Sequence, residues 1–375
     1  MSDQARLKVL ITNLGLDLRG GTESVVRDVA LGLLRRGHRP IVYSPHLGPP
    51  AFELQQRGVA TISDLGQMAE APDVIHGQHF IQTAEAILHF PSTPVVSVCH
   101  AWTFWQERPP KFPQVRRYVC VDEAVRDRLV HVEGIDPTKT EIILNAVDLT
   151  RIPPRPAPLS RKPQTALAFT KNKAQLPVLA AACEQRGIRL STLGAGGDRQ
   201  VAEPEDELVR YDVVFATARM ALEAMCAGAA VIICDARGFG GPVSSGNLEH
   251  LRRLNFGLRA LVHQVSPEAV SEALAGYDPD DAAAVSAAVR DRANFEVALD
   301  RYVAVYQDAI ADMAAHPVAE ADYRKARLAF LNQALPRRRT DGRWLWMVER
   351  ENLMARINEL DRELAAARQT PPPGV

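Results

Sequence analysis

A glycine pair near the N-terminus is the first feature of the sequence that could bind an anion. Gly20, Gly21 and Thr22 stand between a strand-like apolar run, residues 8–13, and a helix-like segment, residues 22–36. Glycine lacks a Cβ atom, so a ligand can approach the backbone, and the start of a helix presents unpaired N–H groups. The pattern is neither a Gly-x-Gly-x-x-Gly fingerprint nor a Walker sequence, so a tight turn explains it equally well.

A second glycine-dense segment, residues 237–247, directly follows an apolar run at 230–234 that reads as a strand. Backbone amides of a loop in this place can wrap a phosphate or a sugar. Gly240 and Gly241 are therefore ligand-binding candidates, and a flexible lid without direct contact is the equal alternative.

Three histidines, His76, His79 and His100, stand at or near the ends of strand-like segments. His100 follows the apolar run 95–98. Ligands of open α/β sheets bind at the carboxyl ends of the strands, which favours a functional role for His100. Its alternative is a hydrogen-bonded core histidine, and His76 can simply cap its strand.

The elements that must position these residues alternate along the chain, which predicts an α/β fold with parallel strands, since parallel pairing needs a crossover. The predicted strands are residues 8–13, 40–43, 73–76, 95–98, 118–121 and 142–144, followed by 166–169, 188–193, 212–215 and 230–234. The predicted helices are residues 22–36, 122–130, 176–186, 219–226, 299–310, 323–334 and 344–368.

Five prolines between residues 151 and 164 interrupt this alternation and predict a linker. We therefore expect two Rossmann-like, doubly wound domains, residues 1–150 and 165–297. A final helix at 298–316 can cross back onto the first domain. The tail, residues 317–375, is expected to be helical and partly coiled-coil-like.

The composition excludes several classes of protein. Lys and Arg number 44 against 45 Asp and Glu, a net charge of −1, which gives no basic surface for general nucleic-acid binding. The hydrophobic share of 46% excludes wholesale disorder. Five cysteines without a Cys-x-x-Cys pair are expected to be reduced and buried. No apolar run approaches the roughly 18 residues of a spanning helix, and no signal peptide is evident, so we expect a cytoplasmic protein, with peripheral contact to a membrane surface as an alternative.

Several segments together resemble the B-fold glycosyltransferases, in particular the bacterial retaining, nucleotide-sugar-dependent group similar to family 4. They occur in the order seen in that group, from about residue 8 to residue 310. These segments are residues 20–23, 73–79, 98–100, 122–126, 143–148 and 222–228.

The resemblance implies roles for single residues. Gly20, Gly21 and Thr22 would face the diphosphate and the acceptor, and His100 would lie against the transferred sugar. His79 could line the acceptor pocket. Glu223 matches the second carboxylate of a Glu-x7-Glu motif that accepts hydrogen bonds from ribose hydroxyls.

The sequence departs from the family at two points. Phe215 stands where the first motif carboxylate should be, in a connection that looks shortened, and the arginine that should precede the donor-binding lysine is missing. Lys171 or Lys173 could hold the diphosphate as a point charge. Arg219 lies four residues before Glu223, so both side chains are on the same face of the predicted helix. The forked guanidinium group of Arg219 suits phosphate oxygens. The alternative is that Arg219 and Glu223 form a surface ion pair worth about 0.3–0.5 kcal/mol.

The tail lies outside the resemblance. Four apolar residues, Leu353, Ile357, Leu360 and Leu364, form a short seam at coiled-coil spacing. A helix packed on its own domain, self-association through these helices and capture of a partner remain alternatives. The arginines at 337–339 are expected to form a solvated loop, with anionic lipid headgroups as the minority alternative.

We therefore expect a glycosyltransferase that moves a hexose-like unit from a nucleoside diphosphate sugar to a hydroxyl acceptor, with retention, in the synthesis of a cell-surface glycan or glycoconjugate. No metal or other cofactor is needed in principle, because cationic side chains and the N–H groups at helix starts can balance the negative charge of the diphosphate. The alternatives are a nucleotide-sugar epimerase and a non-catalytic binding or assembly module.

Overall fold

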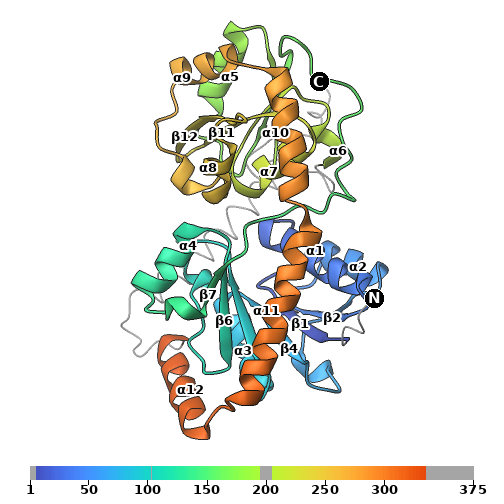
Figure 1. Ribbon diagram of the computed structural model, residues 1–375, viewed down its shortest axis with the longest axis vertical. Helices are drawn as coiled ribbons and strands as arrows, with labels where there is room; N and C mark the ends of the chain where they lie inside the picture. The colour runs from blue at the N-terminus through green and yellow to red at the C-terminus, as the bar shows by residue number, and fades with distance from the viewer. Residues whose placement is uncertain (1–5, 103, 195–204, 335–375) are drawn as a thin grey trace, which may run out of the picture. The chain divides into compact units, whose positions relative to one another are not determined.

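A computed structural model describes residues 6–102, 104–194 and 205–334. The chain forms two compact units, residues 1–319 and 320–375, and each is described by itself. The larger unit contains two β-sheets with helices on both faces, which confirms the predicted α/β class of two Rossmann-like domains (Figure 1).

The first sheet has seven strands in the order β3-β2-β1-β4-β5-β6-β7, and every pair is parallel. The chain winds outward from β1 to β3 and then returns to the other side of β1 with β4. The strands are β1 (Lys8–Thr12), β2 (Arg39–Tyr43), β3 (Ala60–Ile62), β4 (Val74–Gln78), β5 (Val95–Cys99), β6 (Val115–Cys120) and β7 (Thr140–Ile142).

Two long helices cover one face of this sheet. Valines and isoleucines at alternate positions of β1 and β5 pack against α1 (Gly21–Arg35) and α11 (Phe295–Ala315) in one apolar cluster. Figure 1 shows α11, drawn in orange, running across the strands although it follows the second sheet in sequence. The other helices around this sheet are α2 (Pro49–Gln56), α3 (Phe80–His89) and α4 (Glu123–Asp127).

The second sheet has five strands in the order β12-β11-β10-β8-β9. All pairs are parallel except β11 with β12. Its strands are β8 (Thr165–Phe169), β9 (Arg189–Leu193), β10 (Val213–Ala216), β11 (Ala230–Asp235) and β12 (Gly238–Pro242). Its helices are α5 (Leu176–Gln185), α6 (Glu205–Leu208), α7 (Ala218–Cys226), α8 (Leu248–Arg253), α9 (Pro267–Ala275) and α10 (Pro279–Arg292).

Three expectations about local structure are wrong. The strand predicted at 142–144 lies two residues earlier, as β7. The helix predicted to run to residue 130 changes at Arg128 into a π-helical turn. The segment 237–247, expected to be a loop, contains β12, which pairs antiparallel with β11. A Cβ atom on Gly240 would lie 2.5 Å from the carbonyl oxygen of Ala260, so close packing explains this glycine.

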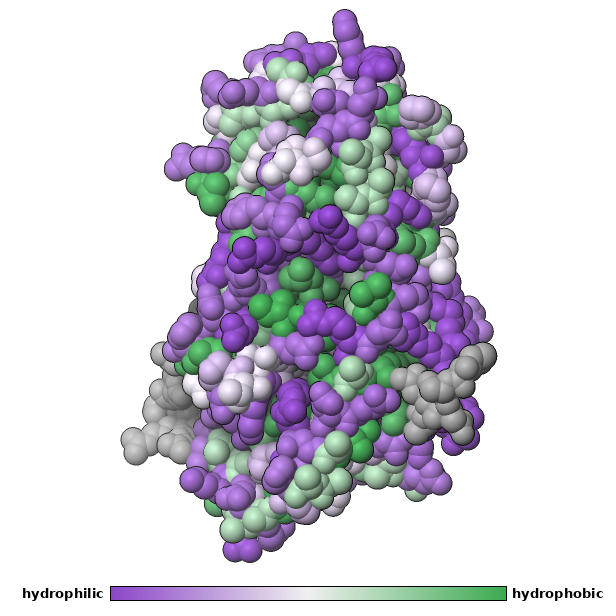
Figure 2. All heavy atoms as spheres, in the orientation of Figure 1, coloured by the Kyte–Doolittle hydropathy of each residue, from purple (hydrophilic) through white to green (hydrophobic). Residues whose placement is uncertain are grey.

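The five cysteines are all buried and unbridged, as expected. The smaller unit contributes one described helix, α12 (Glu320–Ala334), while the seam at 353–364 and the arginines at 337–339 lie outside the described residues. Hydrophilic side chains cover most of the face shown in Figure 2, with apolar residues in small groups. Among the described residues, no helix combines the length and apolar character needed to cross a bilayer.

Candidate functional site

The candidate site is built from the two places where the strand order reverses. In the first sheet the reversal lies between β1 and β4, and in the second between β8 and β10. Ligands of doubly wound sheets bind outside the carboxyl ends of the strands at such points. Gly20–Thr22 and His79 follow β1 and β4, whereas Lys171 and Arg219 follow β8 and β10.

The structure brings Gly21 and Lys171 together. A Cβ atom placed on Gly21 would lie 3.7 Å from Nζ of Lys171, so the ammonium faces the start of α1. Gly20 is the N-cap residue of α1, and no side chain of the described residues caps this helix. The first N–H groups of α1 and the Lys171 ammonium therefore offer positive charge from both domains at one point.

Other predicted candidates lie elsewhere. Lys173 is exposed, and its carbonyl accepts a hydrogen bond from Leu176 at the start of α5. Gly240 and Gly241 belong to the edge strand β12 of the second sheet. Thr22 is half-buried, and its hydroxyl donates to Glu23 at 3.1 Å.

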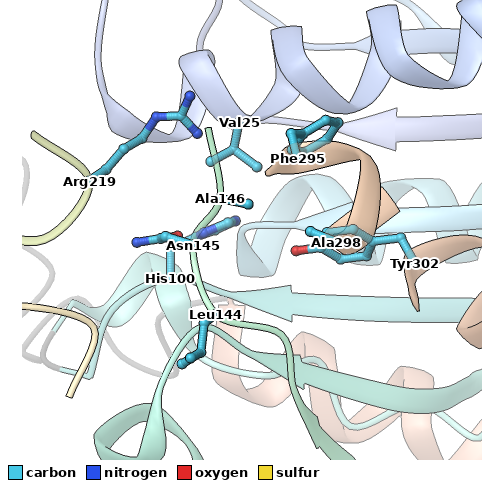
Figure 3. A pocket seen from close by; sticks show the side chains of 9 residues that line it. All are labelled: Val25, His100, Leu144, Asn145, Ala146, Arg219, Phe295, Ala298 and Tyr302. Atoms are coloured by element: carbon cyan, nitrogen blue, oxygen red, sulfur yellow. The ribbon is translucent and has the colours of Figure 1, made fainter. Parts of the chain in front are cut away.

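His100 lines a small cavity together with Asn145, Arg219 and Tyr302 (Figure 3). The rest of the wall is apolar and comes from α1, α11 and the segment after β7. Burial is the main cause that lowers the pKa of His100 to about 3, and nearby His79, His76 and Arg219 act in the same direction. The ring is therefore neutral at pH 7 and can accept a hydrogen bond through Nε2, which has no partner among the described residues.

Arg219 is buried, and two carboxylates hold it. Its Nε donates to Oε1 of Glu223 at 2.9 Å, and its terminal nitrogen Nη2 contacts Asp28 of α1. Asp28 is also 3.2 Å from Arg151, which lies in the segment between the two sheets. Because both side chains of the Arg219–Glu223 pair are almost inaccessible to solvent, the alternative prediction of a surface ion pair is wrong. Its guanidinium charge is met by Asp28 and Glu223, and the pair with Asp28 ties α7 to α1.

The connection before Glu223 is as short as the sequence suggested. Only Thr217 separates β10 from α7, and Ala218 begins the helix at φ 51°, a strained value for alanine. Phe215 is fully buried inside β10. Glu223 itself is 7% exposed and faces Arg219, so a ribose would have to share this carboxylate.

Sequence reasoning missed a buried carboxylate, Glu107, beneath the histidines. Its Oε2 accepts the backbone N–H of His100 at 2.7 Å, and its Oε1 lies 3.6 Å from Nε2 of His79. His79 accepts the N–H of Leu14 through Nδ1, which leaves its proton on Nε2. Burial lowers the pKa of His79 to about 4 and raises the pKa of Glu107 to about 7, so both are largely neutral near pH 6.

We expect the Glu107→Gln variant to change how stability depends on pH. A raised carboxyl pKa means that the folded state holds its proton more tightly, so this stabilisation is full below pH 4.5 and is lost as the pH rises to about 7. Relative to the variant, the wild type should lose about 3 kcal/mol over that range. Urea unfolding between pH 4.5 and 8 measures the difference, with the exposed Glu249→Gln as control; parallel curves for wild type and Glu107→Gln would contradict it.

Asp28 was also missed, although α1 carries a signal for it. Asp28 stands three residues after Val25 and next to Val29, within the apolar stripe of the helix. A lone acid on a buried face implies a cationic partner. No sequence pattern marks Glu107, because its hydrogen bond comes from the backbone N–H of His100.

Comparisons with known proteins agree with this architecture. The family Glycosyltransferase Family 4 matches residues 19–151. A glycosyltransferase from Rickettsia africae is 13% identical, with 82% of this chain and 99% of that chain covered and a TM-score of 0.59. HepE from Anabaena, solved with UDP-glucose, is 14% identical, with coverage of 81% and 100% and a TM-score of 0.58.

A putative UDP-N-acetylglucosamine 2-epimerase from Listeria monocytogenes has the same fold at 13% identity, with 84% of this chain and 97% of that chain covered and a TM-score of 0.51. No curated protein matches the sequence significantly. At these low sequence identities the structural neighbours show only that the fold is shared, and the family match covers only the first domain. The chain therefore has the B fold of these solved glycosyltransferases, and its first domain is similar to Glycosyltransferase Family 4 over residues 19–151.

Proposed function

We propose that the chain transfers a hexose-like unit from a nucleoside diphosphate sugar to a hydroxyl acceptor, with retention of configuration. The bond between the anomeric carbon and the diphosphate breaks, and a bond to the acceptor oxygen forms. The acceptor proton leaves with the departing phosphate. The proposal extends to the synthesis of cell-surface glycans or glycoconjugates.

One juxtaposition carries the proposal: Lys171 of the second domain faces Gly21 at the uncapped start of α1. Departure of a nucleoside diphosphate concentrates negative charge on phosphate oxygens, and an ammonium opposite helix N–H groups stabilises that charge. HepE, which shares the fold, was solved with UDP-glucose, and this supports a donor of the same class.

Glu223 and His100 complete the proposed site. Glu223 would accept the ribose hydroxyls through the oxygen that does not face Arg219, and neutral His100 would lie against the sugar. The proposal needs no metal, because Lys171 and the start of α1 supply the positive charge. Transfer that stops in EDTA and returns with Mg²⁺ would contradict this part.

The Lys171→Met variant tests the proposal. We expect its Kd for a nucleoside diphosphate sugar to rise about tenfold, because a charge-assisted phosphate contact is lost. Calorimetry with UDP-, GDP- and dTDP-glucose gives the affinities, and product analysis with and without acceptor separates transfer from epimerisation.

Two controls sharpen this test. Lys162→Met removes an exposed lysine from the proline-rich segment and should leave donor affinity unchanged. Lys173→Met examines the alternative lysine; both lysines are exposed, but Lys171 is the one that faces Gly21. A wild-type protein that binds none of the nucleotide sugars would overturn the proposed function, and an unaffected Lys171→Met variant would overturn the role of this lysine.

A further inference from the structure

Two buried amide side chains and the half-buried His100 form a row at the carboxyl edge of the first sheet. Asn13, Gln78 and His100 follow or end β1, β4 and β5, which are neighbours in the sheet. Side chains alternate between the faces of a strand, so Asn13 shares a face with Ile11, and His100 shares one with Val98. Both apolar residues belong to the cluster under α1 and α11.

Gln78 lies on the same face. Its amide nitrogen lies 3.3 Å from Nε2 of His76, whose Nδ1 is 2.6 Å from the hydroxyl of Tyr306 in α11. The row therefore occupies the point where the strand order reverses, between β1 and β4, and continues onto β5. This is the place where a doubly wound sheet binds its ligand.

The two amides are oriented by their donor groups. Nδ2 of Asn13 donates to the carbonyl of Gly15 at 2.6 Å and lies 3.3 Å from Oε1 of Glu23. Nε2 of Gln78 donates to the neutral His76 ring, whose pKa burial lowers to about 3. In both cases the nitrogen is engaged within the protein, which leaves the carbonyl oxygen for another partner.

These oxygens have no partner in the part of the chain that the structure describes. Oδ1 of Asn13, Oε1 of Gln78 and Nε2 of His100 are all inaccessible to solvent and lack a hydrogen bond. Native proteins rarely leave buried polar atoms unpaired, and here three such atoms gather on one face at one edge of the sheet, which favours a ligand-binding role for this row.

The chemistry of the free atoms selects the kind of group that fits. Two are carbonyl oxygens, which only accept hydrogen bonds, and a neutral imidazole can accept one as well. An ionised phosphate offers acceptors and repels such atoms, whereas a sugar hydroxyl offers a donor. The short β10–α7 connection presents little else for a sugar, since it consists of Thr217 alone.

We propose that Asn13 and Gln78, beside His100, bind hydroxyl groups of the transferred sugar and so determine which sugar is accepted. This inference rests on the proposed function, because it presumes a nucleotide-sugar donor. It assigns sugar recognition to the first sheet, and diphosphate recognition to Lys171 and the start of α1.

The Gln78→Met variant is the direct test. Methionine fills nearly the same volume without an acceptor oxygen. For the nucleotide sugar of the UDP-, GDP- and dTDP-glucose panel that the wild type binds best, we expect a Kd roughly tenfold higher, because one buried hydrogen bond is lost. The Kd of the corresponding nucleoside diphosphate, which has no sugar, should stay unchanged.

Gln114 offers a matched control. It is also fully buried, its Nε2 donates to the carbonyl of Pro91, and its Oε1 also lacks a partner, but it precedes β6 at the opposite edge of the sheet. Gln114→Met makes the same chemical change and should leave the Kd for both ligands unchanged. Asn13→Leu provides a second variant in the row, with an expected loss of the same kind.

A ligand-side measurement keeps the inference testable even where a variant folds poorly. Nucleotide sugars that lack single hydroxyls should bind the wild type more weakly at one or two ring positions. If Gln78 binds one of these hydroxyls, the Gln78→Met variant should bind the sugar that lacks this hydroxyl and the unmodified sugar with the same Kd.

The outcomes distinguish failure of the proposed function from failure of this inference. If the wild type binds no nucleotide sugar, the proposed function itself falls. If the wild type binds one but Gln78→Met and Asn13→Leu bind sugar and nucleoside diphosphate as the wild type does, the inference is wrong and buried water satisfies the row. Equal weakening of both ligands, or an effect confined to the KM of the acceptor, would also overturn it.

Discussion

Replacing Arg219 with methionine is expected to lower the melting temperature of the protein by about 10 °C. Arg219 joins Glu223 on its own helix to Asp28 on α1, and all three side chains are nearly inaccessible to solvent. Removing one partner of a buried ionic group leaves an uncompensated charge, which costs about 3–5 kcal/mol. Because Asp28 keeps Arg151, most of that cost falls on Glu223. Differential scanning calorimetry measures the shift.

An exposed ion pair provides the control for this prediction. Arg259 and Asp127, 2.6 Å apart, also come from the two domains, but both are accessible to solvent. Arg259→Met should therefore change stability by less than about 1 kcal/mol. The double variant Arg219→Met, Glu223→Gln removes both charges of the helix pair while Asp28 keeps Arg151, and it should be more stable than Arg219→Met alone. If Arg219→Met and Arg259→Met melt alike, the buried network does not hold α7 against α1.

The same Arg219 variant separates two roles of this arginine. A diphosphate contact predicts a weaker affinity for nucleoside diphosphates in addition to the lower melting temperature. A purely structural arginine predicts lower stability with donor affinity unchanged below the melting transition. The structure favours the second outcome, because Asp28 and Glu223 already meet the guanidinium charge.

The fold followed from the sequence because it rests on local patterns. Apolar runs of four to six residues alternate with helical periodicity, and glycines with positive φ follow the ends of α1 at Gly37 and of α7 at Gly228. The strand β12 escaped prediction because glycine-rich sequences usually form loops. Here they permit close approach to the carbonyl of Ala260.

The site was predictable only in part, since its contacts join distant residues. Asp28 and Arg219 are 191 positions apart, and no pattern in either segment indicates that the two residues form a pair. The facing of Lys171 and Gly21 likewise depends on how the two sheets meet. Single residues such as His100 could be predicted from their place after a strand, because that place is a local property of the chain.

Acid is expected to destabilise the protein through its three buried histidines, His76, His79 and His100. Burial lowers their pKa values to about 3, 4 and 3, so the folded state holds them neutral while the unfolded state protonates them near pH 6.5. Their contribution to stability is complete above pH 7 and is lost as the pH falls below 6.5. Between pH 7 and pH 5 each histidine should account for about 2 kcal/mol.

Glu107 opposes this trend and lets the two effects be separated. Its raised pKa returns about 2 kcal/mol of stability over the same interval, so the four groups together should cost about 3–4 kcal/mol. In the Glu107→Gln variant the acid loss should therefore be steeper than in the wild type. Urea unfolding at pH 7, 6 and 5 measures both slopes.

Variants of single histidines complete the test. His100→Asn removes one protonation site and should reduce the acid loss by about a third of the histidine contribution, whereas replacing the exposed His131 by Asn should leave the pH dependence unchanged. An equal slope for wild type and His100→Asn would show that the ring titrates alike in the folded and unfolded states. In that case His100 would be mostly protonated near pH 6, and the row proposed to bind the sugar would contain a histidine that donates hydrogen bonds instead of accepting them.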